Sequence, residues 1–437
     1  MNSSLLEIQR GLALLSVFRT LSNDPLLRSL SELLSRLETK NKEANETEEA
    51  EETKIQNLLS AYGAFCAAVY DAGGHLANAV EQMVLESENA CLRTALRGQN
   101  LSDALLSAAK RDLALLERIA VLTPEDFSEV SRIADFHETL PGWSTSSKNI
   151  SRPFFTMLSN LESTGYGIFR SGRVFRIRKD GSLSPLDHRR ILPISSLYGY
   201  ERERRLVLDN TRALAEGGNP AHVLLYGDAG TGKSTTIKAC AAEFFDRGLR
   251  LIELKKHQLH FLPDIAEQLS QSPLRFILFL DDLSFREEDD DFCFLKSLLE
   301  GDVAGEADNI RVYASSNRRH LIRESFDART GNEIHQNDTL QESMSLADRF
   351  GLTVTFSKPE KDLYQQIVRN LANEYALPLG EKELLLKAEA FAIRAGGRSP
   401  RTAKQFVRAL TISHAAHTPD TAAPVDTTHA ADTALID

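Results

Sequence analysis

The sequence predicts an α/β fold, in which helices cover a parallel sheet and further helical segments precede and follow it. Two patterns predict this fold. Between residues 195 and 357, short apolar runs alternate with helical patterns, which is typical of a parallel sheet. Residues 1–150 and 358–413 instead carry their apolar residues at helical spacing. The runs expected to form strands are Val223–Tyr226, Leu249–Leu254, Phe276–Leu280, Ile310–Ala314 and Leu352–Phe356.

The composition is that of a globular protein. The 437 residues are 42% apolar, which excludes disorder of the whole chain and the collagen-like and disulfide-scaffold classes. The formal net charge of −11 argues against coating of nucleic acid along the whole length, although a local basic face stays open. The four cysteines are far apart, so we expect reduced thiols. No membrane-spanning run or secretory leader is evident, and we expect a cytoplasmic protein without membrane contact.

Residues 1–150 are expected to form a helical N-terminal domain. An early amphipathic helix is predicted from Leu12, Leu14, Leu15, Phe18, Leu21, Leu26 and Leu27. A later helix is predicted from Leu101, Leu105, Leu106, Leu113 and Leu116. Between these helices, residues 41–53 hold six glutamates. This acidic run is read as a solvated connector or an exposed helix, with a partner-binding acidic arm as the alternative.

Residues 151–194 are expected to form a connector that contains a small β-hairpin. Apolar residues from Ile168 to Ile177 flank Gly172, and Asp180-Gly181 follows as a turn. Basic and aromatic side chains alternate here, a pattern that can hold phosphates and stack bases. The same alternation is typical of any half-buried strand, which is the favoured interpretation. The basic residues are Arg170, Arg173, Arg176, Arg178, Lys179, Arg189 and Arg190.

After the α/β part, residues 358–413 are expected to form a helical lid. Its helices are predicted over 362–375, 381–395 and 401–413. Residues 414–437 are rich in Ala, Thr, Asp and Pro without apolar periodicity, and we expect a disordered tail.

A glycine-rich segment after the first strand matches the phosphate-binding P-loop pattern. Its glycines allow successive main-chain amides to face one centre, and the helix that begins near Lys233 adds the positive end of its dipole. Lys233 is expected to reach the β- and γ-phosphates, and the Ser234 hydroxyl to ligate Mg²⁺. The residues predicted to hold the nucleotide here are Gly227, Asp228, Ala229, Gly230, Thr231, Gly232, Lys233, Ser234 and Thr235.

A buried strand that ends in two acids provides the second part of this site. The run Phe276–Leu280 is followed by Asp281 and Asp282, the Walker B arrangement. We expect Asp281 to lie in the magnesium shell through water, and Asp282 to orient or deprotonate the attacking water. Many proteins that combine a P-loop with such a strand have glutamate at the second position. Aspartate is one methylene shorter, so hydrolysis is a weaker expectation than binding. The nearby run Glu287–Asp291 is interpreted as a solvated loop.

Three further side chains are candidates for catalysis. Asn317 follows the strand beside the two acids and is placed to hold the nucleophilic water. Arg349 precedes the last strand and can reach the nucleotide of an adjacent protomer, with an ion pair to Asp348 as the alternative. In the lid, Arg401 lies in the first turn of a helix and can contact the phosphates, and Arg398 is the competing choice.

In this order, these motifs resemble the AAA+ ATPase module, and the Leu197–Glu201 stretch resembles the box that holds adenine there, with Tyr198 and Tyr200. More narrowly, four stretches resemble a bacterial ATP-binding family, domain of unknown function 815, over roughly residues 150–412. The resemblance implies a P-loop NTPase fold with a helical lid, ATP and Mg²⁺ as ligands, and assembly into a ring or filament, but no substrate. The four stretches are Gly227–Thr235, Phe279–Phe285, Ala314–Leu321 and Leu346–Gly351.

Three functions are compatible with the sequence. The favoured one is an ATPase that remodels or loads an unknown protein partner through its N-terminal helices. The second is an ATP-binding scaffold or switch with little or no hydrolysis. The third is a nucleic-acid loader that uses the basic residues of the 170–190 segment.

Overall fold

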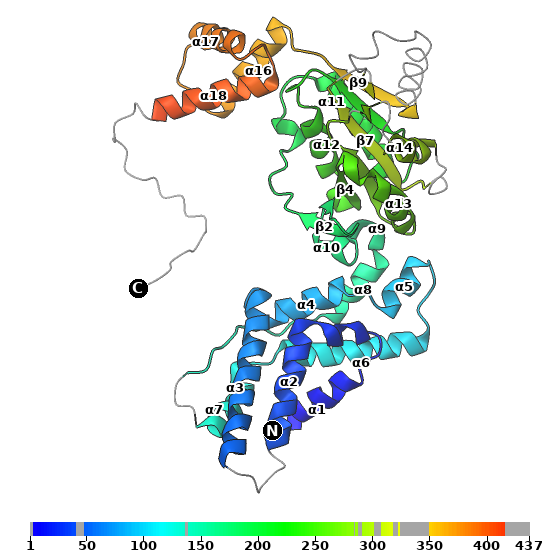
Figure 1. The fold of residues 1–437 in the computed structure, drawn as a ribbon, viewed down its shortest axis with the longest axis vertical. Helices are drawn as coiled ribbons and strands as arrows, with labels where there is room; N and C mark the ends of the chain where they lie inside the picture. The colour runs from blue at the N-terminus through cyan, green and yellow to red at the C-terminus, as the bar shows by residue number, and fades with distance from the viewer. Residues whose placement is uncertain are drawn as a thin grey trace.

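The computed structural model describes residues 3–40, 48–135, 139–283, 285–286, 291–300, 307–317, 322–323 and 349–415. A helical part at the N-terminus, an α/β part and a C-terminal helical lid follow one another along the chain (Figure 1). The lid lies at the far end of the α/β part from the N-terminal helices (Figure 1). The expected fold class is therefore confirmed. In the part of the chain that is described, no helix is both long enough and apolar enough to cross a bilayer.

The α/β part is built on a seven-stranded sheet with the order β2-β1-β4-β5-β7-β3-β9. All neighbouring strands are parallel except β1 and β2. Each of the five strands expected from the apolar runs is present. The strands are β1 Val174–Ile177, β2 Leu183–Leu186, β3 Val223–Gly227, β4 Leu249–Leu254, β5 Arg275–Leu280, β7 Ile310–Ser316 and β9 Leu352–Phe356. The short strands β6 (Phe285–Arg286) and β8 (Ile322–Arg323) pair separately.

Helices cover both faces of this sheet and bury a separate core on each. Consecutive residues of a strand point to opposite faces, so Leu224 joins one core while Val223 and Leu225 join the other. This two-sided burial explains why the strands read as continuous apolar runs. The helices are α11 (Glu201–Ala215) and α12 (Lys233–Ala242) on one face, and α13 (Leu262–Ser270) and α14 (Asp291–Glu300) on the other.

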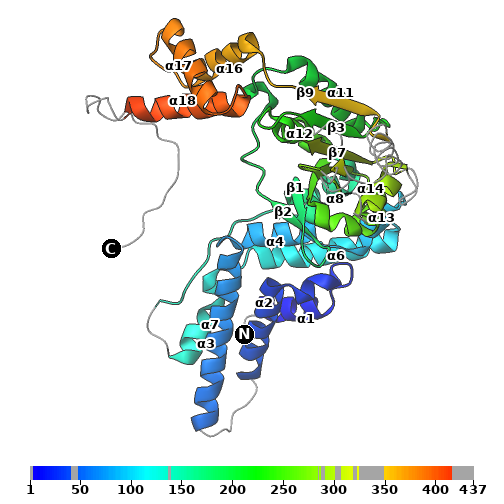
Figure 2. The ribbon, with the colours of Figure 1, turned by 45° about the horizontal axis from the view of Figure 1, so that its top comes forward.

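The hairpin expected as a separate connector is instead the edge of the main sheet. Strand β1 pairs in parallel with β4, Val174 opposite Leu251, while β2 forms the outer edge. Phe169 was expected in a strand but lies in the short helix α10 (Ile168–Ser171), where its ring packs 5.0 Å from that of Phe175. Both views place this edge on the side of the sheet nearest the N-terminal helices (Figures 1 and 2).

The N-terminal helices share one apolar core that extends to Leu161. The early amphipathic helix predicted from Leu12 to Leu27 is wrong in its continuity, because the chain turns between Ala13 and Arg19 and leaves Leu14 67% exposed. The helices are α1 Ser3–Ala13, α2 Pro25–Lys40, α3 Glu48–Asp71, α4 Leu76–Glu86, α5 Ala90–Leu96, α6 Asp103–Ala120, α7 Ser128–Ala134, α8 Ser151–Ser159 and α9 Leu161–Thr164. Residues 41–47 of the acidic run lie outside the described residues, and the rest of the run begins α3.

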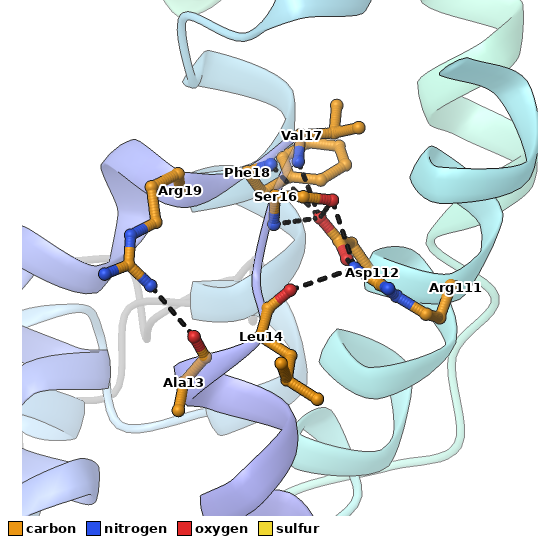
Figure 3. A network of polar contacts seen from close by, with 8 residues as sticks. All are labelled: Ala13, Leu14, Ser16, Val17, Phe18, Arg19, Arg111 and Asp112. Atoms are coloured by element: carbon orange, nitrogen blue, oxygen red, sulfur yellow. Dashed lines mark hydrogen bonds and ion pairs between the residues drawn. The ribbon is translucent and has the colours of Figure 1, made fainter. Parts of the chain in front are cut away.

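A buried carboxylate on α6 holds the turn between α1 and α2 (Figure 3). Asp112 is 2% exposed, and its Oδ2 accepts hydrogen bonds from the amides of Ser16 at 2.9 Å and Val17 at 2.8 Å. The Phe18 amide donates to the same oxygen at 3.4 Å, and Arg111 donates to Oδ1 at 3.0 Å. The carboxylate thus satisfies main-chain donors where the early helix is interrupted.

We expect Asp112→Ala to lower the free energy of unfolding by about 2 to 4 kcal/mol, because it leaves buried amides without an acceptor. Urea denaturation of the full chain measures this loss. The exposed Asp103→Ala on the same helix is the control, and we expect it to cost about 1 kcal/mol or less. Equal losses in the two variants would contradict the role given to Asp112.

The lid is a small helical unit with its own apolar core, which includes Tyr364, Val368 and Val407. It consists of α16 (Lys361–Glu374), α17 (Glu381–Arg394) and α18 (Pro400–Ala415), close to the expected bounds. Helix α18 continues through the first two residues of the expected tail. The remainder of that tail, 416–437, lies outside the described residues, as do 287–290 of the second acidic run.

Candidate nucleotide-binding site

A cavity of about 610 Å³ is lined by the carboxyl ends of the strands, the P-loop and the lid. It brings together most of the side chains predicted for the site. The predicted residues that line it are Tyr198, Tyr200, Ala229, Gly230, Thr231, Gly232, Lys233, Ser234, Thr235, Asp281, Asp282, Asn317 and Arg401. Gly227, Asp228 and Arg349 are not among the lining residues.

The P-loop joins the end of β3 to the start of α12 and has the main-chain shape of an anion nest. Gly227, Gly230 and Gly232 have φ angles of 134°, 81° and 97°. A Cβ atom on Gly227 would lie 2.2 Å from the carbonyl oxygen of Phe356, so only glycine fits between β3 and β9. The first turn of α12 lines the cavity and places the positive end of the helix dipole there.

Lys233 holds a buried ammonium group at this loop. The residue is 5% exposed, and its Nζ donates to the carbonyl oxygens of Gly227 at 2.9 Å and Asp228 at 2.8 Å, and to Asn317 Oδ1 at 3.0 Å. Burial lowers the pKa of Lys233, while the nearby carboxylates of Asp228, Asp282 and Asp281 oppose that shift. The result is a buried cation whose three donors are all held by acceptors at the loop and the strand end.

At the end of β5, Asp281 lies against the first turn of α12. Its Oδ1 accepts hydrogen bonds from the hydroxyls of Ser234 at 2.5 Å and Ser315 at 2.6 Å. A hydroxyl and a carboxylate side by side are the hard oxygen donors that Mg²⁺ prefers, usually with several waters retained. These two residues therefore fit a magnesium ion beside the phosphate loop.

Asp282 has a left-handed backbone with φ of 55°, which is uncommon outside glycine and is adopted most readily by Asn and Asp. Its amide donates to Ser315 Oγ at 3.0 Å, and its Oδ1 accepts from Asn317 Nδ2 at 2.7 Å. Because Lys233 donates to the other end of the Asn317 amide, a polar chain runs from Lys233 through Asn317 to Asp282. The strand-end amide therefore connects the Lys233 ammonium to the second acid.

The lining of the cavity also includes aromatic and apolar side chains. Tyr198 and Tyr200 line it from the segment before α11, and Ile367, Leu371 and Tyr375 line it from the lid. The Tyr200 ring packs 5.1 Å from Phe356, and burial raises the pKa of its phenol. A partly apolar region with aromatic side chains is suited to a planar base.

The lid provides basic groups on the other wall. Arg401 lines the cavity together with Lys404, and the main-chain amide of Arg401 donates to the Gly230 carbonyl at 3.2 Å. Arg398 is instead held by Glu389 through a bidentate ion pair, in which Nε donates to Oε1 at 3.2 Å and Nη2 donates to Oε2 at 2.9 Å. Of the two arginines left open by the sequence, the geometry thus favours Arg401.

Arg349 lies near the amino-terminal ends of β9 and β3, whereas the P-loop follows the carboxyl end of β3. Strand β9 begins directly after Gly351, and the Leu352 amide donates to the main-chain carbonyl of His222, which precedes β3. Because β9 runs parallel to β3, the whole of β9, about 16 Å at 3.3 Å per residue, separates Arg349 from the P-loop end. Arg349 is therefore not placed to contact a nucleotide in its own chain. Asp348, its alternative partner, lies outside the described residues.

Sequence reasoning missed several cavity residues. Ser315 precedes Asn317 by two positions, and residues two apart along a strand lie on the same face. This spacing could have predicted that Ser315 lies at the site, where it donates to Asp281. Arg204 on α11 lines the cavity with a side chain only 10% exposed, and Lys404 lines it from α18. No motif marks these two residues, because tertiary packing alone brings their helices to the site. Across the described ranges, no group of three or more His, Cys, Asp or Glu side chains is arranged to hold a metal.

Comparison with solved structures gives distant likenesses. A variant of RuvB from Thermotoga maritima is 18% identical, with 49% of this chain and 63% of that chain covered and a TM-score of 0.34. AMPPCP-bound DnaA from Aquifex aeolicus is 15% identical, with 50% and 64% covered and a TM-score of 0.36. A katanin structure titled for its self-assembly is 15% identical, with 52% and 73% covered and a TM-score of 0.33. The chain thus spans less than two thirds of the first of these proteins.

The comparison with family models is more specific. Among curated proteins, none matches this chain. The model described as protein of unknown function (DUF815) matches residues 171–414, from the start of the β1–β2 edge to the end of the lid. Because this match covers more than half of the sequence and includes every residue that lines the cavity, the protein belongs to the DUF815 family.

Proposed function

We propose that this protein is a Mg²⁺-dependent ATPase of the AAA+ type, which couples nucleotide turnover to movement of its lid. The observation that carries the proposal is the polar chain from Lys233 through Asn317 to Asp282, next to the Ser234–Asp281 pair in one cavity roofed by the lid. Binding alone would need only the phosphate loop. A carboxylate that is positioned beside the phosphate site can orient and deprotonate water, which hydrolysis needs and binding does not.

Each part of the cavity has a role in this reaction. The P-loop amides and Lys233 hold the β- and γ-phosphates, and the tyrosine end of the cavity accepts the adenine. Ser234 directly and Asp281 through water would hold Mg²⁺, which neutralises charge on the phosphate oxygens. Asn317 fixes the carboxylate of Asp282, which orients the attacking water and accepts its proton. Arg401 adds positive charge from the lid as the cavity closes.

Assembly and partner binding are parts of the same proposal. Arg349 is remote from its own cavity, which supports a ring or filament in which it serves the neighbouring protomer. The N-terminal helices, at the other end of the α/β part from the lid, would receive the motion and transmit it to a protein partner that is remodelled or loaded.

The basic segment offers less support for a nucleic-acid function. The Arg173 side chain is only 21% exposed, donates to the Arg170 carbonyl at 2.8 Å and lies 3.8 Å from Asp246. Arg173, one of the basic residues of the 170–190 segment, is thus engaged in contacts within the protein.

We expect Asp282→Asn to lower the rate of phosphate release from ATP by about 100-fold or more, the usual contribution of a general base. ATP affinity should stay within about threefold, because asparagine preserves the size and an acceptor for Asn317. A coupled phosphate-release assay and a binding titration measure the two quantities. The exposed Asp264→Asn on α13 is the control and should match the wild type.

The assay also separates hydrolysis from simple binding. If the wild type binds ATP but releases phosphate no faster than Lys233→Ala, the chain is an ATP-binding scaffold or switch and the ATPase proposal is wrong.

A further inference from the structure

The side chain of Asp228, the second residue of the P-loop, contacts the entrance to the lid rather than the cavity. Its Oδ2 accepts a hydrogen bond from the main-chain amide of Lys358 at 2.9 Å. Its own amide donates to the carbonyl of Phe356 at 3.0 Å. Lys358 lies between the end of β9 and the start of α16, so one P-loop residue holds the chain on both sides of Ser357, where it leaves the sheet for the lid.

A second point of the lid, between α17 and α18, also rests on the P-loop. Where the chain begins α18, the amide of Arg401 donates to the Gly230 carbonyl at 3.2 Å. A Cβ atom on Gly230 would lie 3.2 Å from Ser399 Oγ, closer than most real contacts of this kind. The entrance to the lid and the start of its last helix are therefore both attached to the same short loop, through Asp228 and Gly230.

Tyr200 holds the lid entrance from a second direction. Its hydroxyl donates to the Ser357 carbonyl at 2.6 Å. The segment from Phe356 to Lys358 is thus fixed between the P-loop and the segment expected to hold adenine. Any displacement of the P-loop main chain at Asp228 must be passed to Lys358 or must break their hydrogen bond.

We propose that Asp228 is a positioning residue that ties the lid entrance to the phosphate loop, so that binding of phosphates to the loop sets the position of the lid. The effect on the lid rests on the proposed nucleotide function, whereas the hydrogen bond between Asp228 and Lys358 is present in the protein without nucleotide. It also predicts a simple chemical requirement at position 228, namely a hydrogen-bond acceptor of the right length. Asparagine provides that acceptor without the charge, and alanine does not.

Amide hydrogen exchange in the nucleotide-free full chain tests the tie directly. In Asp228→Ala we expect exchange at the Lys358 amide to rise about tenfold, the loss of protection that one hydrogen bond confers. Asp228→Asn should keep wild-type protection. Asp362→Ala, which removes an exposed acid at the start of α16, is the matched control and should leave Lys358 unchanged.

The consequence for the nucleotide is measured by the dissociation of ribose-labelled fluorescent ADP in the presence of MgCl₂. We expect about tenfold faster release from Asp228→Ala, because the lid is no longer held over the cavity, and a nearly wild-type rate from Asp228→Asn. Unchanged Lys358 exchange in the alanine variant overturns the inference. Asn and Ala variants that behave alike also overturn it, because charge rather than the hydrogen bond would then matter. A wild type that binds no ADP refutes the proposed function instead, and leaves the exchange result standing.

Discussion

Lys233→Ala is expected to weaken binding of ATP in the presence of Mg²⁺ by about 100-fold or more, because it removes charge-assisted hydrogen bonds to two phosphates. The ammonium is buried and already oriented by the carbonyls of Gly227 and Asp228 and by Asn317. Phosphate binding has to replace some of these three contacts, but it needs little further ordering of a side chain that is already buried at the loop. Equilibrium dialysis or calorimetric titration of the folded variant measures the effect.

The control for this variant is on the same helix. Lys238 lies on α12 and pairs with Glu253 outside the cavity, so Lys238→Ala removes an equal charge without touching the site. We expect its affinity for ATP to match the wild type. If Lys233→Ala binds ATP as well as Lys238→Ala does, the cavity is not the phosphate site.

Arg349→Ala is expected to reduce ATP turnover by about 10³-fold or more while the affinity for ATP is retained, as for an arginine supplied by a neighbouring protomer. The physical reason is the direction of β9, which places Arg349 at the amino-terminal ends of the strands, remote from the P-loop of its own chain. Phosphate release at saturating ATP and a parallel binding titration separate the two effects. Arg394→Ala, an exposed arginine of the lid helix α17, is the control.

A mixing experiment identifies which chain provides the arginine. Asp282→Asn protomers lack the proposed base but still carry Arg349, and Arg349→Ala protomers have the reverse defect. Equal mixtures should regain measurable turnover, because some interfaces then combine an intact acid with an intact arginine. Absence of any recovery, together with reduced ATP affinity of Arg349→Ala alone, would show that Arg349 has a structural role within its own chain.

Local sequence patterns were sufficient for the strands but not for all of their partners. Strands buried on both faces appear as apolar runs, and β4 was predicted at its observed bounds. The pattern of β1 gave a strand and a turn correctly, but alternation does not reveal which distant strand completes the pairing. For β1 that partner is β4, which lies far along the chain. The break at Leu14 was missed for a similar reason, since Asp112 on a distant helix stabilises the turn.

The same difference between local patterns and distant packing holds for the candidate site. The P-loop is contiguous, so its residues and their order were visible in the sequence, and the cavity gathers most of them. The contribution of Arg204 and Lys404 depends on how α11 and α18 pack, which no local pattern encodes. Asp228 was predicted as a nucleotide contact because it lies within the motif, but its side chain hydrogen-bonds Lys358 and does not line the cavity.

The left-handed backbone at Asp282 gives a reason for the shorter acid at this position. Aspartate tolerates that conformation better than most residues with a side chain, and glutamate has no comparable advantage. The carboxylate already reaches Asn317 at 2.7 Å, so an extra methylene would have to fold back or displace the amide. A left-handed main chain at the end of β5 is thus combined with a compact acid that already reaches the strand-end amide of Asn317.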